Sequence, residues 1–272
     1  MITQAAALIE RVRTSNPLIH HITNYVTVND CANITLAIGA SPIMADALAE
    51  AADIAAMAQA VVLNMGTLNE RTIPAMLAAG AAANRAGIPV VLDPVGAGAS
   101  PLRGDTARQI LDAVALTVLR GNSSEIRFMA GLSSSTKGVD ASDSDLASDS
   151  DAMAVAKAAA QKLGCTVVIT GPVDTVSNGV HGWRIANGHP MLARLTGTGC
   201  MCSSLIGSFC GAAPDAPLTA CIAALLTEGI AGEIAYEQAG AQGTGSFRVA
   251  FHDAVSRMTA DTLVGRAKLY EA

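Results

Sequence analysis

The stretch IPVVLDPVGAG, residues 88–98, decides the class of fold. Between Pro89 and Asp93 it holds an uninterrupted apolar run. A strand with one exposed face alternates apolar and polar residues, whereas a strand of a parallel sheet is covered on both faces and is apolar throughout. The run therefore predicts a buried strand of a parallel sheet, followed by a glycine-rich loop at its carboxyl end.

The same pattern recurs along the chain, and Ala-rich helical segments separate the recurrences. Strands are expected at 60–66, 116–122 and 165–171. Parallel strands need long crossover connections, which are usually helices. The spacing predicts such helices at 69–87, with Asn69 as N-cap and Gly87 as its terminal glycine, at 107–115, at 123–129, and in a longer segment that ends at Gly164. The chain is thus expected to be an α/β protein with a mostly parallel central sheet and helices on both faces.

The remaining segments complete one expected domain, residues 1–272. Residues 171–195 contain Ser-Asn-Gly and Ala-Asn-Gly turns and predict an antiparallel addition to the sheet. From Leu205 to the end the pattern is helical, with breaks at 211–217 and 240–246. The Ser/Asp-rich segment 131–151 predicts an exposed loop, with Asp149 or Ser150 capping the next helix.

Composition disfavours several functional classes. The net charge of −6 gives no broad basic field, so nucleic acid is not an expected partner. Residues 1–17 carry charges within an apolar pattern, as an amphipathic helix does, and Glu228 and Glu233 interrupt the apolar segment 217–236. No membrane association is therefore expected. The six cysteines lie at irregular spacings without a CxxC pair, which favours a reduced, cytoplasmic protein and disfavours a structural zinc site.

Polar and glycine residues follow the predicted strands. These strand ends are NMG at 64–66, DPVGAG at 93–98, RGNSSE at 120–125 and TG at 170–171. In open α/β sheets, ligands bind outside the carboxyl ends of the strands. The four strand ends are therefore expected to meet at one ligand site.

The stretch LTGTGCMCSS, residues 195–204, lies at the start of a further predicted helix. Gly197 and Gly199 allow successive backbone N–H groups to converge on an anion, and the helix N-terminus adds partial positive charge. A tight turn before any helix has similar glycines, so the turn alone does not identify a phosphate site. Cys200 falls in the first helical turn, where the helix dipole is expected to lower the thiol pKa. A buried small hydrophobic residue is the other interpretation of this cysteine.

Six elements, in this order, resemble the hydroxyethylthiazole kinase family across nearly the whole chain. They are NPLIHHITNYVTVNDCANITLAIGASPIMA at 16–45, LNMGTL at 63–68, VLDPVGAGAS at 91–100, RGNSSEI at 120–126, VVITG at 167–171 and LTGTGCM at 195–201. The resemblance implies a ribokinase-like fold and a homotrimer with its sites at subunit interfaces. It also implies Mg²⁺- and ATP-dependent phosphorylation of 4-methyl-5-(2-hydroxyethyl)thiazole in thiamine salvage.

The resemblance also implies roles for single residues. Cys200 matches the catalytic base, a position that is Asp in most ribokinase-like kinases. The other matches are Met44, Asn24, Val26, Gly66 and Gly197 for the thiazole, Arg120, Thr170 and Asn122 for ATP, Gly197, Thr198 and Gly199 for the anion hole, and Asp93 and Glu125 for the metal.

Other interpretations remain open at this point. The chain could phosphorylate another small alcohol, such as hydroxymethylpyrimidine, or bind a nucleotide or a thiazole without catalysis. Met44 could be a core residue, Asp93 could close a turn, and Glu125 could favour the first turn of a helix. On a strand, one of His20 and His21 is expected to point inward and the other outward, with hydrogen-bonding or packing roles instead of a catalytic one.

Overall fold

The computed structural model describes residues 1–132 and 149–272. Most of the Ser/Asp-rich segment expected as a loop, residues 133–148, lies outside the described residues. Helix α7 spans Asp149–Leu163, and the capping role predicted for Asp149 or Ser150 rests on side chains outside the described ones.

The described strands form one sheet in the order β2-β1-β3-β4-β5-β6-β7-β8-β9. The pairs from β2 to β6 are parallel, and the pairs from β6 to β9 are antiparallel. The strands are β1 Leu18–Ile22, β2 Ser41–Ile43, β3 Ala60–Asn64, β4 Val90–Asp93, β5 Val118–Gly121, β6 Thr166–Ile169, β7 Asp174–Ser177, β8 Gly182–Ile185 and β9 Leu269–Glu271.

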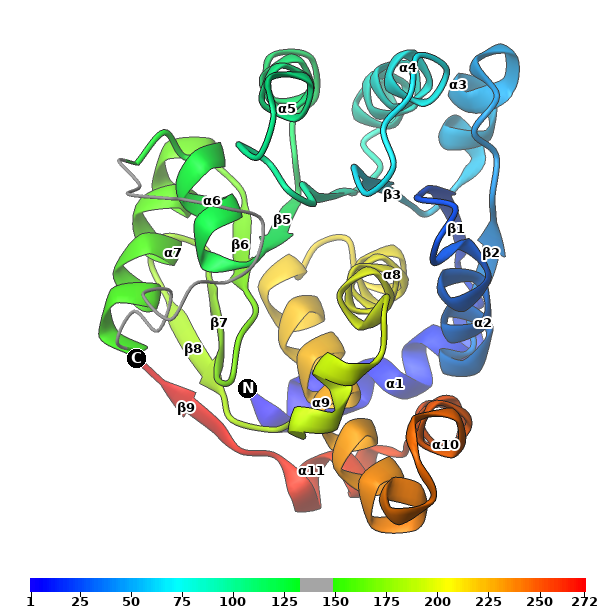
Figure 1. Cartoon of the computed structure of the whole chain (residues 1–272), viewed down its shortest axis with the longest axis vertical. Coiled ribbons are helices and arrows are strands. Elements are labelled where there is room, and N and C mark those ends of the chain that lie inside the picture. Colours follow the sequence, from blue (N-terminus) through cyan, green and yellow to red (C-terminus); the bar gives the residue numbers. More distant parts are fainter. Residues whose placement is uncertain (133–148) are drawn as a thin grey trace.

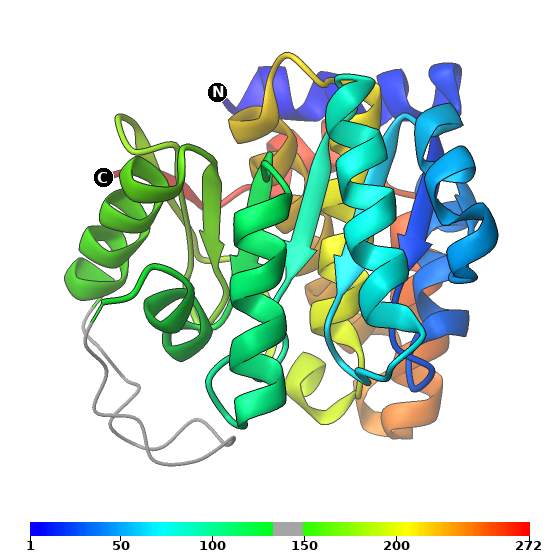
Figure 2. The ribbon, with the colours of Figure 1, turned by 90° about the horizontal axis from the view of Figure 1, so that it is seen from above.

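Helices cover both faces of this sheet (Figure 1). One face carries α7 together with α3 (Leu48–Met57), α4 (Thr72–Arg85), α5 (Pro101–Ala113) and α6 (Ser123–Met129). Figure 2 shows α4 and α5 in front of the strands, with the yellow and orange helices behind them. The helices of this second face are α1 (Ile2–Ser15), α2 (Val28–Ile38), α8 (Thr198–Ala212), α9 (Pro217–Ala239), α10 (Thr244–Ser256) and α11 (Ala260–Arg266). The predicted α/β class with a mostly parallel, doubly covered sheet is confirmed.

Successive strand residues enter two separate hydrophobic cores. Val61 and Leu63 pack into the core on the α4 side, whereas Val62 between them packs into the core around α8. The same alternation holds in β4, where Val90 and Leu92 lie opposite to Val91. Because both faces are covered, no position along these strands tolerates a polar side chain until the strand ends.

Helix boundaries follow local capping signals. The helix predicted at 123–129 is confirmed, and Gly87 ends α4 in the left-handed region with φ +69°. Helix α4 begins at Thr72 with Arg71 as its N-cap, so the predicted N-cap position at Asn69 is wrong, although the Asn69 side chain accepts the N–H of Thr72. Helix α5 begins at Pro101, six residues before the predicted 107, because Ser100 accepts the N–H of Arg103 and caps it.

The C-terminus departs from the predicted helical pattern. Residues 269–271 form β9, which pairs antiparallel with β8. This pairing joins segments more than 80 residues apart, and no local propensity signals it.

Helix α9 is a core helix of the second face. Residues 217–242 are long and apolar enough to cross a membrane by length and composition alone, and they contain an 18-residue window with a mean hydropathy of 1.5. However, 72% of that window is buried inside the protein. The burial explains the hydropathy, because the helix is surrounded by other helices and the sheet.

Candidate active site

The carboxyl ends of the central strands meet the N-terminus of α8. Helix α8 packs on β1, β3 and β4, and Cys200 lies in its first turn. The Sγ atom of Cys200 lies 3.3 Å from Nδ2 of Asn24 and 3.3 Å from Nδ2 of Asn64, and both amides donate to it. Residues from two strand ends therefore converge on the thiol.

Asp93, the last residue of β4, is the buried anion at the centre of this group. Its Oδ2 atom accepts hydrogen bonds from Asn64 Nδ2 at 2.9 Å and Ser203 Oγ at 2.9 Å, and it lies 3.4 Å from Nη1 of Arg120. Burial raises the pKa of Asp93 to about 6, although the Arg120 charge acts in the opposite direction. Burial alone would lower the pKa of Arg120, but Asp93 and other nearby acids raise it, so the guanidinium stays charged.

The electrostatics of Cys200 differ from the prediction. Burial, and next the nearby Asp93 carboxylate, raise the pKa of the Cys200 thiol above its ordinary value. Hydrogen bonds from Thr27, Asn24 and Asn64 offset this effect only in part. The predicted lowering of the thiol pKa is therefore wrong, because desolvation and a neighbouring negative charge outweigh the helix dipole.

In the TGTGC turn, residues 196–200, the backbone amides of 198–200 have no hydrogen-bond acceptor within residues 1–132 and 149–272. Gly197 precedes α8 with φ +89°, and no side chain caps the helix. The first intrahelical bond runs from Met201 N–H to Gly197 O, so the amides of residues 198–200 precede it. A Cβ atom on Gly199 would lie 2.6 Å from Nη1 of Arg120, so glycine is needed for the close approach of the guanidinium.

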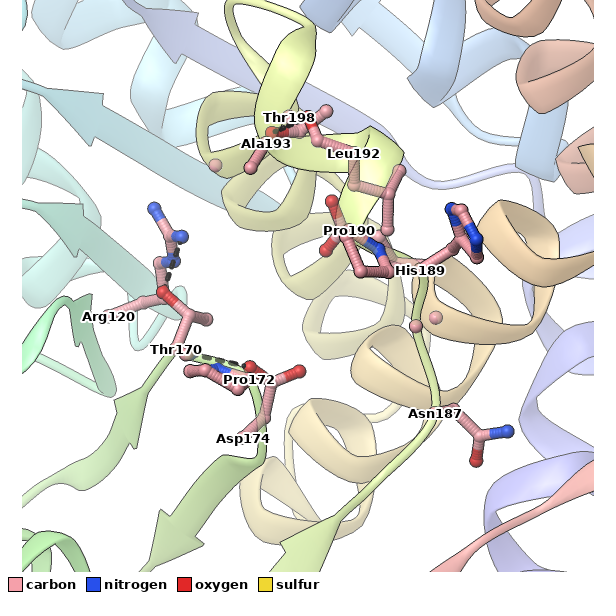
Figure 3. Close-up of a pocket in the computed structure, with 15 residues that line it drawn as sticks. Arg120, Thr170, Pro172, Asp174, Asn187, His189, Pro190, Leu192, Ala193 and Thr198 are labelled. Carbon is pink, nitrogen blue, oxygen red and sulfur yellow. Dashed lines mark hydrogen bonds between the residues drawn. The ribbon is translucent and has the colours of Figure 1, made fainter. Parts of the chain in front are cut away.

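Two cavities flank this group. The larger, about 570 Å³, is lined by Arg120, Thr170, Thr198 and Gly199 among others (Figure 3), and Arg120 Nη2 donates to Thr170 Oγ1 at 2.6 Å. The smaller, about 280 Å³, is lined by Met44 together with His21, Thr23, Tyr25 and Val28. Cys200 directly follows Gly199, which lines the larger cavity. Its Sγ atom accepts a hydrogen bond from Asn24, whose neighbours Thr23 and Tyr25 line the smaller cavity. The thiol is therefore linked through Gly199 and Asn24 to both cavities.

Some predicted site residues have structural partners here. The Asn122 side chain caps α6, and Glu125 completes this capping box by accepting the N–H of Asn122 at 2.8 Å. The other Glu125 oxygen accepts the N–H of Gly96 at 2.7 Å. Gly66 donates its N–H to Asn64 Oδ1 at 2.8 Å, and a Cβ atom on Gly66 would lie 2.7 Å from Asn24. Val26 is 54% exposed and lines neither cavity.

Several residues of the site carried no assignment from sequence. Asn64 belongs to the NMG strand end, which the sequence predicts to be part of the ligand site. Ser203 lies about one helical turn after Cys200. Asp174 of β7 and Glu228 of α9 line the larger cavity. No sequence pattern predicts that Asp174 and Glu228 share a cavity, because one lies on an antiparallel strand and the other on a core helix.

The adjacent histidines are both buried, since both faces of β1 are covered. His20 Nε2 donates to the Ala45 carbonyl at 2.7 Å, and His21 Nε2 lies 3.3 Å from Thr35 Oγ1. The predicted hydrogen-bonding role is confirmed for both.

Comparison with known proteins identifies the family. The model of the hydroxyethylthiazole kinase family matches residues 9–261. The chain belongs to the hydroxyethylthiazole kinase family. It is therefore an enzyme, a phosphotransferase of the kinase type.

Individual relatives agree along the full chain. A hydroxyethylthiazole kinase of Ruminiclostridium cellulolyticum is 57% identical over 98% of this chain and 97% of its own. One from Methanocella arvoryzae is 45% identical, covering 97% of each chain. The solved structure of hydroxyethylthiazole kinase from Pyrococcus horikoshii superposes with a TM-score of 0.88 at 40% identity, covering 98% of each chain. Bacillus subtilis pyridoxal kinase, with a TM-score of 0.58 at 17% identity over 79% of this chain and 90% of its own, shares the fold alone.

Proposed function

We propose that this kinase transfers the terminal phosphoryl group of ATP to the hydroxyl of 4-methyl-5-(2-hydroxyethyl)thiazole, a step of thiamine salvage. The observation that carries the proposal is the Cys200 thiol at the N-terminus of α8, next to Gly199 of the larger cavity and hydrogen-bonded to Asn24, whose neighbours line the smaller one. The larger cavity, with Arg120 and Thr170, accommodates the nucleotide. The smaller one, with Met44 half-buried in its wall, accommodates the thiazole.

In this proposal the free amides of residues 198–200 form the anion hole. They stabilise negative charge on the phosphoryl group in flight, and the Arg120 guanidinium neutralises charge on the neighbouring phosphate. Phosphoryl transfer passes through a loose transition state, so positioning and charge neutralisation supply most of the catalysis. Asn24, Gly66 and Gly197 then position the alcohol beside Cys200.

Cys200 serves as the base that accepts the hydroxyl proton as its thiolate. Because the thiol pKa is raised, the thiolate is a minor form at neutral pH. A loose transition state needs little deprotonation before the oxygen attacks, so this minor form is sufficient. The amides of Asn24 and Asn64 donate to Sγ and favour the thiolate once it forms.

The residues present fit a magnesium ion held mainly by phosphate oxygens. Mg²⁺ in such sites takes one or two protein carboxylates. Within the described residues, the donors to Asp93 converge on Oδ2, which leaves Oδ1 for an ion, and Glu125 supplies a second negative charge nearby. When bound, the ion would neutralise the charge of the transferring phosphate.

A homotrimer in the cytoplasm, where ATP is available, completes the proposal. The loop after β1 and the start of α2 expose Tyr25 (78%) and Val26 (54%), and Leu36 on α2 is also exposed (57%). Tyr25 lines the smaller cavity, and Val26 follows it in the chain. A second subunit packed on them would close the thiazole site and bring Val26 into it.

A coupled ADP-release assay tests the substrate. We expect turnover with the thiazole alcohol to exceed turnover with hydroxymethylpyrimidine, pyridoxal and ribose by at least about 100-fold in kcat/KM. Faster turnover with one of the other alcohols would contradict the proposed substrate. Tight binding of ATP and the thiazole in calorimetry without any phosphate transfer would indicate a binding protein instead.

A further inference from the structure

The larger cavity contains two carboxylates that the catalytic group does not use. Asp174 begins β7 and Glu228 lies in the middle of α9, and both line the cavity. Burial, as the main cause, raises the pKa of each to about 7. Desolvated carboxylates destabilise a fold unless donors satisfy them.

The protein itself supplies few donors to these two groups. Asp174 Oδ1 accepts the N–H of Gly171 at 3.0 Å, and Glu228 accepts the weak thiol donor of Cys202. Within the described part of the chain, no other side chain donates a hydrogen bond to either carboxylate. Each carboxylate has about four acceptor positions, so most remain available to a ligand in the cavity.

The position of Asp174 indicates which part of a nucleotide it would meet. Figure 3 shows Thr198 and Asp174 at opposite ends of the cavity, with Asn187 at the Asp174 end. The transferring phosphate has to lie at the Thr198 end, next to the free amides of α8. The nucleoside therefore extends toward Asp174.

From this geometry we infer that Asp174 and Glu228 accept hydrogen bonds from the sugar hydroxyls of the nucleotide and select ribonucleotides over deoxyribonucleotides; the inference rests on the proposed kinase function. Two vicinal hydroxyls are donors that a carboxylate binds well, and a hydrogen bond to a charged group in a desolvated site discriminates strongly against an analogue that lacks it. An ionised Asp174 beside the triphosphate would repel it, so electrostatics also favours the nucleoside end for this carboxylate.

The test compares ATP with 2′-deoxy-ATP and 3′-deoxy-ATP at a fixed concentration of the thiazole alcohol. We expect kcat/KM for ATP to exceed that for at least one deoxy analogue by about 10- to 100-fold. Glu228→Gln and Asp174→Asn should each bring this ratio to within about threefold of unity for one sugar position, mainly by raising KM for ATP. Asp174→Asn retains an oxygen for the Gly171 N–H, so its fold should survive, and thermal unfolding checks both variants.

The matched control is Glu237→Gln. Glu237 lies on the same helix, is exposed and pairs with Arg266, so its substitution changes the charge equally without touching the cavity. It should leave the ratio unchanged. Equal use of ATP and both deoxy analogues by the unmodified enzyme would overturn the inference. An unchanged ratio of ATP to deoxy-ATP kcat/KM in both Asp174→Asn and Glu228→Gln would also overturn it. A preference for ATP over inosine triphosphate that these variants abolish would contradict it as well, because the carboxylates would then contact the base.

Calorimetry separates this inference from the proposed function. Binding of ADP, 2′-deoxy-ADP and 3′-deoxy-ADP is measured without any alcohol. If the enzyme transfers no phosphate to the thiazole but binds ADP at least about tenfold more tightly than a deoxy analogue, and Glu228→Gln removes the difference, the proposed substrate fails and the sugar contacts stand.

Discussion

At the scale of the residue, the Cys200 thiol is the group whose chemistry the surroundings change most. We predict that Cys200→Ala lowers kcat by about 10²- to 10⁴-fold and leaves KM for the thiazole nearly unchanged, because a base acts in the transition state. Cys200→Asp should retain activity or exceed it, since a carboxylate is largely ionised at neutral pH and the raised-pKa thiol is not. Steady-state kinetics at saturating ATP measure both.

Cys165→Ala is the control for these variants, because Cys165 is a buried cysteine that precedes β6 and lines no part of the two proposed substrate cavities. It should keep full activity. Full activity in Cys200→Ala as well would reduce Cys200 to a packing residue and leave the amides of residues 198–200 as the main catalytic groups.

The raised thiol pKa can be measured independently of turnover. Among the described cysteines, Cys200 is partly accessible and the other five are buried. We predict that iodoacetamide modifies this site slowly at pH 7 and that the rate climbs only above the ordinary thiol range, because the thiolate is the reactive form. Mass spectrometry of the Cys200 peptide follows the rate of modification. Rapid modification at pH 7 would show that the helix dipole lowers the thiol pKa more than burial and Asp93 raise it.

At the scale of the element, α8 crosses the sheet at very short range. A Cβ atom on Gly207 would lie 2.5 Å from Cγ2 of Val62 and 3.3 Å from Cγ2 of Ile19. We predict that Gly207→Ala destabilises the fold by about 1–3 kcal/mol despite the better helix propensity of alanine, because the core is overpacked. Urea unfolding measures the change.

Gly265→Ala in α11 is the matched control for that substitution. Nothing lies within 4 Å of its Cβ position, and its φ is not in the left-handed region. Alanine should be neutral or stabilise by up to about 1 kcal/mol there. Equal effects at both positions would mean that helix propensity, and not packing against β3, governs α8.

At the scale of the whole molecule, burial of His21 links stability to pH. Burial, and secondarily the charge of His20, lower the pKa of His21 to about 3 in the folded chain. Above about pH 6.5 the imidazole is neutral in both states. Below that value His21 becomes protonated in the unfolded chain but stays neutral in the folded chain, so the free energy of unfolding falls progressively toward pH 3.

At pH 5 the difference in His21 protonation between the two states lowers the free energy of unfolding by about 2 kcal/mol. We predict that His21→Gln loses less stability between pH 7.5 and 5.0 than the unmodified chain by about this amount, as measured by urea unfolding at both values. The control is His181→Gln, since His181 is exposed in the turn between β7 and β8. An equal acid sensitivity in His21→Gln would show that other groups cause the loss.

Subunit assembly is the other property of the whole molecule. We predict that Val26→Glu yields monomers in size-exclusion chromatography with light scattering and loses most activity, because it places a charge on the exposed apolar surface beside the smaller cavity. Val180→Glu is the matched control, since Val180 is 75% exposed in the turn between β7 and β8. A trimeric, active Val26→Glu variant would rule out this surface as the interface.

The chain by itself determined the class of fold and the edge where the site lies. Apolar runs such as 90–92 can be satisfied only in strands covered on both faces, and the polar residues that follow them, including Asp93 and Arg120, have to meet at the carboxyl ends. These conclusions are local, because period and position along a strand fix them. The roles of single site residues came from family resemblance and stay proposals.

Only the tertiary structure decided the rest. It buries Cys200 near the Asp93 carboxylate, and together these raise the thiol pKa, although hydrogen bonds from Asn24 and Asn64 offset part of the rise. It also pairs β9 with β8 and places Glu228 of α9 and Asp174 of β7 in the wall of one cavity. Desolvation, charge proximity and strand pairing depend on residues distant in sequence, so no local pattern contains them.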